Sequence, residues 1–312
     1  MSRSKGDIDA IVIGAAAMDM LAWVDQLPSK DGIELARQIE MRPGGSGANV
    51  AVAASRLGAK VGFIARISSD QHGKTLLKEF KREKVDTSAC LIRNDLPTAI
   101  CFIAIDSNGD RSMVALGGAG PVDAFGELDR EYLGKAHLLY VTDVEPEIVK
   151  FTANKFQNKN NFLIYSPGGI IASKGLGGLT EVLPQIDVLL LSQNEAHKLL
   201  PTLSPQIAAE KLHSLGAENV VITLGSHGVL LCNTQGMTSI PSFPVDRVVD
   251  TTGAGDALAG GMIAGLLKGN SLSASILAGC AAAAIKIAQP GARMGLPNQK
   301  QLNNYLSAHI LE

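Results

Sequence analysis

Residues 249–261 read VDTTGAGDALAGG and place an aspartate, Asp256, directly after Gly253, Ala254 and Gly255. The small apolar residues that follow predict a helix that begins near Gly253. The first N–H groups of a helix have no partner within it, and glycines let an anion approach them. A carboxylate at this place can accept a proton from an attacking hydroxyl while the N–H groups stabilise charge on the transferred group. The alternative is structural, with Asp256 as a helix cap and the small residues as packing surface.

A second glycine-rich segment, PGGSGAN at residues 43–49, precedes a run of small residues that ends at Gly58, where the cap of a helix C-terminus is expected. Glycines before a helix let a ligand approach the backbone closely. Asn49 offers both a donor and an acceptor, which suits recognition of a pair of hydroxyl groups. The alternative is that Asn49 only caps the helix.

Two other glycine-containing segments lack the spacing of a nucleotide-binding motif. Residues 71–75 end like a phosphate-binding P-loop, but Ser68 stands where that motif requires a glycine. Residues 14–18 follow the first strand without the further glycines of a dinucleotide fingerprint, so a dehydrogenase is the weaker alternative. The six histidines and four cysteines show no spacing typical of a zinc site, a catalytic triad or a redox pair.

Composition narrows the class of protein. The chain has 312 residues with a formal net charge of -2, which argues against a nucleic-acid-binding surface. Its apolar stretches at residues 257–267 and 277–288 are short and end near Lys268 or contain Lys286, so we expect core helices and no contact with a membrane. Acidic residues interrupt the N-terminal segment, which does not read as a signal peptide. Scattered cysteines fit a reducing compartment, and we expect a cytoplasmic protein.

Short apolar runs at residues 10–13, 61–64, 137–141, 162–165, 188–191 and 220–223 read as strands, and helix-like stretches separate most of them. This alternation predicts an α/β fold, with a parallel sheet covered by helices on both faces. The run at residues 243–249 is also typical of a strand.

Two segments do not follow this alternation of strands and helices. Residues 33–41 and 98–116 alternate apolar with polar side chains, and the dipeptide of Asn108 and Gly109 predicts a tight hairpin turn. We expect antiparallel strands outside the main sheet, either as a lid that excludes water from a site or as an extra sheet edge. The chain is thus interpreted as one domain, residues 1–312, with lid strands from about residues 19–43 and 97–118.

The segments GGSGAN at residues 44–49 and DTTGAGD at residues 250–256 resemble the two signature regions of the ribokinase-like, PfkB-type sugar and nucleoside kinases. Their separation, the lid strands and the chain length fit that family as well. The resemblance implies a ribokinase-like, doubly wound, mostly parallel sheet with a small β-sheet lid. It also implies transfer of the γ-phosphoryl group of ATP, with Mg²⁺, to a primary hydroxyl of a sugar. Asp256 would be the base, and Gly253, Ala254 and Gly255 the anion hole.

The resemblance assigns further residues to the acceptor and to the nucleotide. The acceptor would be bound by Asp19, Gly44, Gly45, Asn49 and Asp143. The nucleotide would be bound by Ser192, Glu195, Thr223, Gly225 and Gly228, with Glu195 organising magnesium through water. Ser192 replaces the first asparagine of the family's Asn-x-x-Glu element. Asp250 matches a possible ligand of a monovalent cation, but Gly295 stands where ribokinases often carry serine, so activation by K⁺ stays open.

The acceptor is left open between a sugar and a nucleoside of the adenosine, cytidine, inosine or guanosine type. Residues 14–19, 98–116 and 165–169 also look similar to archaeal nucleoside kinases of the family. A protein that kept the fold as a non-catalytic sugar or nucleotide binder is a further alternative, although Asp256 is present. Lid strands with an exposed apolar face often pair between subunits, so we expect a homodimer through the lid.

Overall fold

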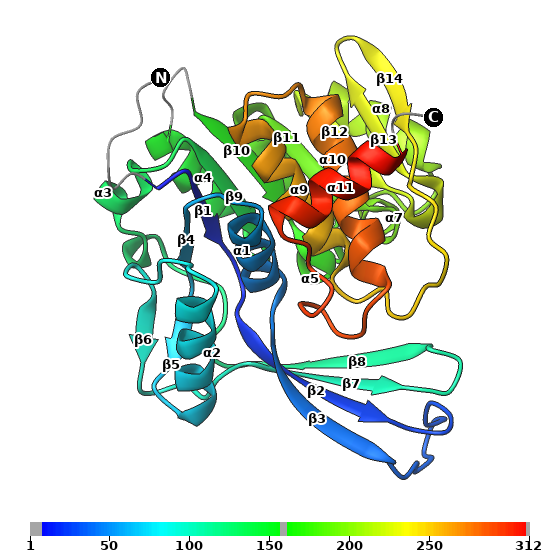
Figure 1. The fold of residues 1–312 in the computed structure, drawn as a ribbon. Helices are drawn as coiled ribbons and strands as arrows, with labels where there is room; N and C mark the ends of the chain where they lie inside the picture. Colours follow the sequence, from blue (N-terminus) through cyan, green and yellow to red (C-terminus); the bar gives the residue numbers. More distant parts are fainter. Residues whose placement is uncertain (1–7, 157–160, 310–312) are drawn as a thin grey trace.

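In a computed structural model, which describes residues 8–156 and 161–309, the main sheet has eight strands (Figure 1). Their order is β14-β13-β12-β11-β10-β9-β1-β4, and all neighbours from β4 to β12 are parallel. The hairpins to β13 and β14 are antiparallel. The bounds are β1 (Ala10–Ile13), β4 (Val61–Ile64), β9 (Leu138–Thr142), β10 (Phe162–Ser166), β11 (Val188–Ser192), β12 (Asn219–Thr223), β13 (Val229–Asn233) and β14 (Gly236–Ile240). The six strands expected from the apolar runs are all present, which confirms the α/β prediction.

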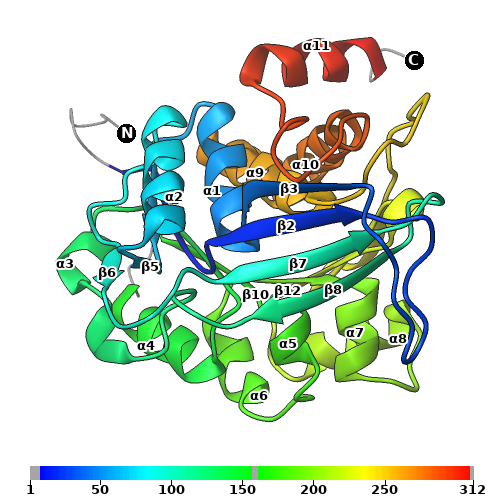
Figure 2. The same cartoon turned by 90° about the horizontal axis from the view of Figure 1, so that it is seen from below.

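Helices cover both faces of this sheet, and each face has its own apolar core (Figure 2). One face carries α1 (Ser46–Arg56), α2 (Gln71–Arg82), α9 (Ala254–Leu267) and α10 (Leu272–Ile287), with α11 (Gln299–His309) outside α10. The opposite face carries α3 (Arg130–Leu133), α4 (Pro146–Phe156), α5 (Gly168–Ala172), α6 (Leu179–Val182), α7 (Gln193–Leu199) and α8 (Pro205–Ser214). Strands buried on both faces need side chains that are apolar throughout, which is why their sequences read as continuous apolar runs.

Small residues let α9 pack against both of its neighbours. A Cβ at Gly261 would stand 2.7 Å from Gly279 Cα on α10, and one at Gly260 would stand 2.9 Å from the backbone nitrogen of Ala54 on α1. Side chains at these two glycines would push the helices apart and open voids in the core. The structural interpretation of the small residues is therefore correct for the body of α9.

A second sheet of four strands projects beside the main one (Figures 1 and 2). It has the order β3-β2-β7-β8, formed by β2 (Ala17–Trp23), β3 (Gln38–Gly44), β7 (Ile100–Ile105) and β8 (Arg111–Leu116). The β7–β8 hairpin turns at Gly109, with φ +85°, as the sequence predicted. We call this four-stranded sheet the lid. A short third sheet pairs β5 (Arg66–Ser68) with β6 (Leu91–Arg93).

Three expectations about strands were wrong. The strand expected at residues 33–41 begins only at Gln38, and the central pair of the lid, β2 with β7, is parallel instead of antiparallel. Residues 243–249 form no strand and pair with no neighbouring strand; four of them line a cavity described below. Among the described residues, no helix combines the length and the apolar character needed to cross a bilayer.

Candidate active site

The N-terminus of α9 places Asp256 in its first turn, as the sequence predicted. Gly253 precedes the helix in the left-handed conformation, φ +77°, and a Cβ there would stand 2.7 Å from the carbonyl oxygen of Ala292. Only glycine suits both the conformation and the close approach. The space beside Gly255 is open, so a ligand can reach its backbone.

Asp256, which is half-buried, ends a chain of hydrogen bonds whose other members, Asn49 and Arg293, are buried. Asn49 Nδ2 donates to Asp256 Oδ2 at 2.8 Å, and Arg293 Nε donates to Asn49 Oδ1 at 2.7 Å. The second bond fixes the orientation of the amide, so that its N–H groups face the carboxylate. Burial raises the pKa of Asp256 to about 7, against the hydrogen bond from Asn49, which lowers it. A carboxylate with this pKa is suited to accept a proton near neutral pH.

Arg293 joins this chain to the lid. Its Nη2 donates to the carbonyl oxygen of Gly44 at 2.9 Å, and its side chain is buried over the ring of Phe80. Nη1 is also buried and has no hydrogen-bond partner among the described residues. Burial lowers the pKa of Arg293 to about 10, which leaves it charged at neutral pH. A buried guanidinium with a free donor is a group that a ligand oxygen can satisfy.

Asp19 lies on β2, opposite the end of β3. A side chain at Gly44 would overlap its carboxylate, so the glycine makes room for Asp19. Burial raises the pKa of Asp19 to about 6, and the charge of Arg293 opposes that rise. Gly45 follows with φ +88° as the N-cap of α1, which orients the segment toward Asn49.

Asp143 lies just after β9, in the left-handed region at φ +58°. Its carboxylate accepts a hydrogen bond from Ser46 Oγ at the start of α1. Gly168, at φ +75°, stands so close that any side chain there would overlap the Asp143 carboxylate. Burial raises the pKa of Asp143 to about 6. A non-glycine residue held in this conformation marks a place where the surroundings impose the geometry.

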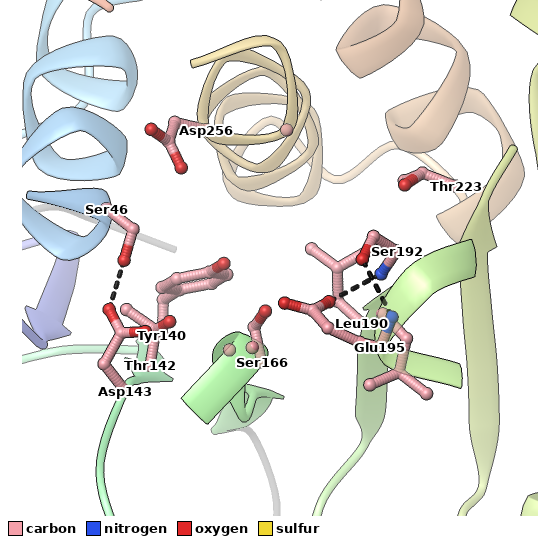
Figure 3. Close-up of a pocket in the computed structure, with 14 residues that line it drawn as sticks. Ser46, Tyr140, Thr142, Asp143, Ser166, Leu190, Ser192, Glu195, Thr223 and Asp256 are labelled. Atoms are coloured by element: carbon pink, nitrogen blue, oxygen red, sulfur yellow. Dashed lines mark hydrogen bonds between the residues drawn. The ribbon is translucent and has the colours of Figure 1, made fainter. Parts of the chain in front are cut away.

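A cavity of about 250 Å³ brings the acidic groups together (Figure 3). Asp256 points into it from α9, and Asp143 and Glu195 enter from the opposite side. Glu195 and Ser192 form a capping box at the start of α7: Ser192 N donates to Glu195 Oε2 at 2.7 Å, and Glu195 N donates to Ser192 Oγ at 3.2 Å. Carboxylate and hydroxyl oxygens are the ligands that Mg²⁺ prefers, usually with several waters retained. The described residues hold no group of three that could chelate a metal, so phosphate and water would complete its shell.

A larger apolar cavity of about 630 Å³ adjoins the first one. The two share Thr223 and Gly255, so a ligand can extend from one into the other. Three residues expected to bind nucleotide line it: Thr223 at the end of β12, and Gly225 and Gly228 just after that strand. Most of its wall was not foreseen from the sequence: Phe243, Pro244, Val245 and Val248 from the loop after β14, and Cys280, Ala283, Ala284 and Ile287 from α10. Its size and apolar lining suit a planar base.

The lid reaches the loop before α9 through Arg111. Its Nη2 donates to Thr251 Oγ1 at 2.8 Å, and its Nη1 donates to Thr252 Oγ1. Asp250 Oδ1 lies 3.6 Å from Arg111 Nη1 and accepts hydrogen bonds from the backbone N–H and hydroxyl of Thr252. This loop, which leads into α9, is therefore also held by the lid.

The structure thus gathers most of the expected residues around two joined cavities. Asp143, Ser192, Glu195, Thr223, Gly255 and Asp256 line the smaller one, and Asn49 contacts Asp256 directly. Asp19 lies beyond Gly44, in the wall of a third cavity of about 260 Å³ together with Arg293 and Arg42. Sequence reasoning missed Arg293, Ser46 and Gly168. Arg293 stands between Gly291 and Gly295, and these flanking glycines were the available signal.

Comparisons with known proteins find relatives over nearly the whole chain. The model of the pfkB family carbohydrate kinases matches residues 7–299. A ribokinase from Haemophilus influenzae is 29% identical over 305 residues, covering 95% of this chain and 97% of that protein. A cytidine kinase from Thermococcus kodakarensis is also 29% identical, covering 87% and 93%. The structure of Arabidopsis thaliana ribokinase complexed with ribose and ATP superposes with a TM-score of 0.86 at 25% identity, covering 96% and 99%.

Proposed function

Because the chain belongs to the PfkB family of carbohydrate kinases and is an alcohol phosphotransferase, we propose that it transfers the γ-phosphoryl group of ATP to a primary hydroxyl of a sugar. The observation that carries the proposal is the position of Asp256. It lies in the first turn of α9, half-buried and hydrogen-bonded by Asn49, and it lines the smaller cavity next to Gly255, which both cavities share.

The acceptor hydroxyl is bound next to the Asp256 carboxylate, which takes its proton as the hydroxyl oxygen attacks the γ-phosphorus. Asp19, Asn49 and Asp143 bind the other hydroxyls, with Gly44 and Gly45 forming the floor. Arg293 Nη1 adds a donor to an acceptor oxygen, which would satisfy a group that has no partner among the described residues. Positioning of this kind, together with stabilisation of charge, supplies most of the rate enhancement in enzymatic phosphoryl transfer.

The nucleotide base occupies the apolar cavity, and the phosphates extend past Thr223 and Gly255 toward Asp256. Gly225 and Gly228 let the loop after β12 approach the ribose and phosphates. The N-terminus of α9 at Gly253, Ala254 and Gly255 stabilises the charge that develops on the transferred group. When bound, Mg²⁺ neutralises phosphate charge, and Glu195, with Ser192 holding its carboxylate, orients the ion through water.

A nucleoside kinase is the second candidate. It is supported by the cytidine kinase, which has the same percentage identity as the H. influenzae ribokinase, over a somewhat smaller part of the chain. The two candidates differ in what lies beyond the acceptor's ribose: a nucleoside places a base against the lid, whereas a sugar leaves that space to water.

The deciding experiment measures ADP release from Mg-ATP with a panel of ribose, fructose, other hexoses, adenosine, cytidine, inosine and guanosine. We expect release that depends on one acceptor and is lost in Asp256→Asn, which removes the base but keeps the shape and the hydrogen bond from Asn49. Phosphorus NMR of the product then identifies the esterified hydroxyl. Release that persists in Asp256→Asn would refute the role of Asp256. Binding of ATP and sugar without release would favour a non-catalytic binder.

We also infer that two chains pair through the lid. One face of its outer strands exposes Ile39, Val114 and Leu116, each at least half accessible. An apolar sheet face of this kind is commonly covered by a partner. Light scattering should give the mass of a dimer for the natural protein and of a monomer for Val114→Lys. A monomeric mass for both would refute the pairing.

A further inference from the structure

Lys286, in the last turn of α10, has no solvent-accessible surface. Its ammonium donates to the carbonyl oxygen of Asp250 at 2.7 Å and more weakly to that of Gln289 at 3.4 Å. A lysine at a helix end normally keeps its charged group in water. A buried charge is costly unless fixed partners replace its hydration, so these carbonyl contacts are a built site.

The loop that Lys286 contacts leads directly into the anion hole. The backbone N–H groups of Val249 and Asp250 donate to the carbonyl oxygen of Ile287 at 2.8 and 3.1 Å, and Gly291 N donates to Asp250 Oδ2 at 2.7 Å. The ammonium lies under the peptide that follows Asp250, three residues before Gly253 caps α9. Its position therefore helps to set the direction of the first N–H groups of the helix.

The chemistry of this place is that of an alkali-cation site. Backbone carbonyl oxygens from two loops converge beside a carboxylate, and oxygen ligands of that kind bind hard cations. The Lys286 ammonium carries the same single positive charge and already uses these carbonyls. Its charge also acts on Asp250 and Asp256, and Arg111 adds a second positive charge from the lid. The residues present thus do not fit an additional K⁺, although Asp250 matched a possible monovalent-cation ligand in the sequence.

We propose that the Lys286 ammonium serves as a tethered replacement for a monovalent cation beneath the anion hole, so that the kinase needs no K⁺. Lys286 acts as a positioning residue, because it touches the loop and not the reacting groups. This inference rests on the proposed kinase function, but binding of a cation to a variant can be tested without turnover.

Two substitutions separate the charge from the volume of the side chain. Lys286→Met keeps most of the side-chain volume and removes the charge. The Asp250 carbonyl oxygen then has no donor, and there is no room for an ion. Lys286→Ala removes both and opens space that a K⁺ ion can enter. Lys268→Met, at the exposed end of α9, is the matched control.

We expect natural protein and Lys268→Met to have equal kcat in K⁺, Na⁺ and tetramethylammonium buffers of the same ionic strength. Both Lys286 variants should lose about 10²-fold in kcat in tetramethylammonium, because a misdirected anion hole costs about that much. K⁺ should raise the kcat of Lys286→Ala by at least about tenfold, a recovery that approaches the effect of one anion-hole donor on kcat. K⁺ should not raise the kcat of Lys286→Met.

Thermal unfolding gives the readout that needs no activity. A cation that binds only the folded state raises the melting temperature, so K⁺ should stabilise Lys286→Ala and leave natural protein and Lys286→Met unchanged relative to Na⁺. Activation of the natural enzyme by K⁺, or a Lys286→Ala variant that folds yet gains neither stability nor activity from K⁺, would overturn the proposal. A third outcome separates the two proposals: if the natural protein has no kinase activity but K⁺ specifically stabilises Lys286→Ala, the proposed function alone is contradicted.

Discussion

The hydrogen bond from Asn49 to Asp256 should set the pH range in which the enzyme works. Asn49→Leu keeps a side chain of similar size and removes the donor that lies 2.8 Å from Asp256 Oδ2. The bond favours the charged carboxylate and opposes the effect of burial, which raises the pKa of Asp256 to about 7. Without the bond, the pKa should rise further, and the acid limb of the kcat/KM profile should move upward with it.

The size of the shift follows from the kind of bond that is lost. A hydrogen bond to a charged group contributes about 1.5–3 kcal/mol, and one pKa unit corresponds to about 1.4 kcal/mol. The acid limb should therefore move by about one to two pH units. At pH 7 the deprotonated fraction would fall from about a half to between about 1% and 10%, so the rate would fall about 5- to 50-fold.

The assay is ADP release as a function of pH with saturating Mg-ATP and limiting acceptor. Asn303→Leu on α11, an exposed asparagine remote from the site, is the matched control and should leave the profile unchanged. Loss of a contact between Asn49 and the acceptor would lower the rate equally at every pH and leave the midpoint in place. A uniform loss with an unmoved midpoint would thus refute the tuning of Asp256 by Asn49, and a natural midpoint near 4 would refute the raised pKa itself.

Three further outcomes are expected. Because the pKa of Asp256 is raised from 3.8 to about 7 by burial, the folded protein binds more protons than the unfolded chain between those pH values, and stability falls as pH rises through them. Asp256→Asn should therefore be more stable than natural protein at pH 8, by at most about 4 kcal/mol, in urea unfolding; equal stability at pH 5 and 8 in both proteins would contradict this. Gly168→Ala forces a side chain into the Asp143 carboxylate and should raise the KM for the acceptor. The control Gly175→Ala has a similar positive φ but open space, so it should only lower the free energy of unfolding, by about 1–3 kcal/mol. Ala284→Leu fills part of the apolar cavity and should raise the KM for ATP about tenfold or more without changing that for the acceptor; an unchanged KM for ATP would place the base elsewhere.

The features that the sequence predicted are those determined by residues close together in the chain. The start of α9 at Gly253 and the turn at Gly109 follow from residues that are neighbours in the chain. Strand positions in the main sheet follow from apolar runs, because strands buried on both faces carry no polar side chains. These elements need no knowledge of distant contacts.

The features that sequence did not predict depend on segments far apart in the chain. Arg293 contacts Asn49 and Gly44, more than two hundred residues away, and nothing near position 293 indicates those partners. Lys286 read as a charge that limits an apolar stretch, yet it is fully buried because the loop at Asp250 supplies carbonyl oxygens. The strand expected at residues 243–249 has the right residue types and lacks a partner strand.

The parallel pairing of β2 with β7 has a consequence for how the protein folds. Met18 pairs with Ile100, and between them the chain leaves the lid to build α1, β4 and α2 in the main body before it returns. The two central strands of the lid can therefore meet only after that excursion has folded, since closing so long a loop costs entropy that local contacts within the lid do not offset. We expect the lid to gain protection from hydrogen exchange late in refolding, after α1 and β4.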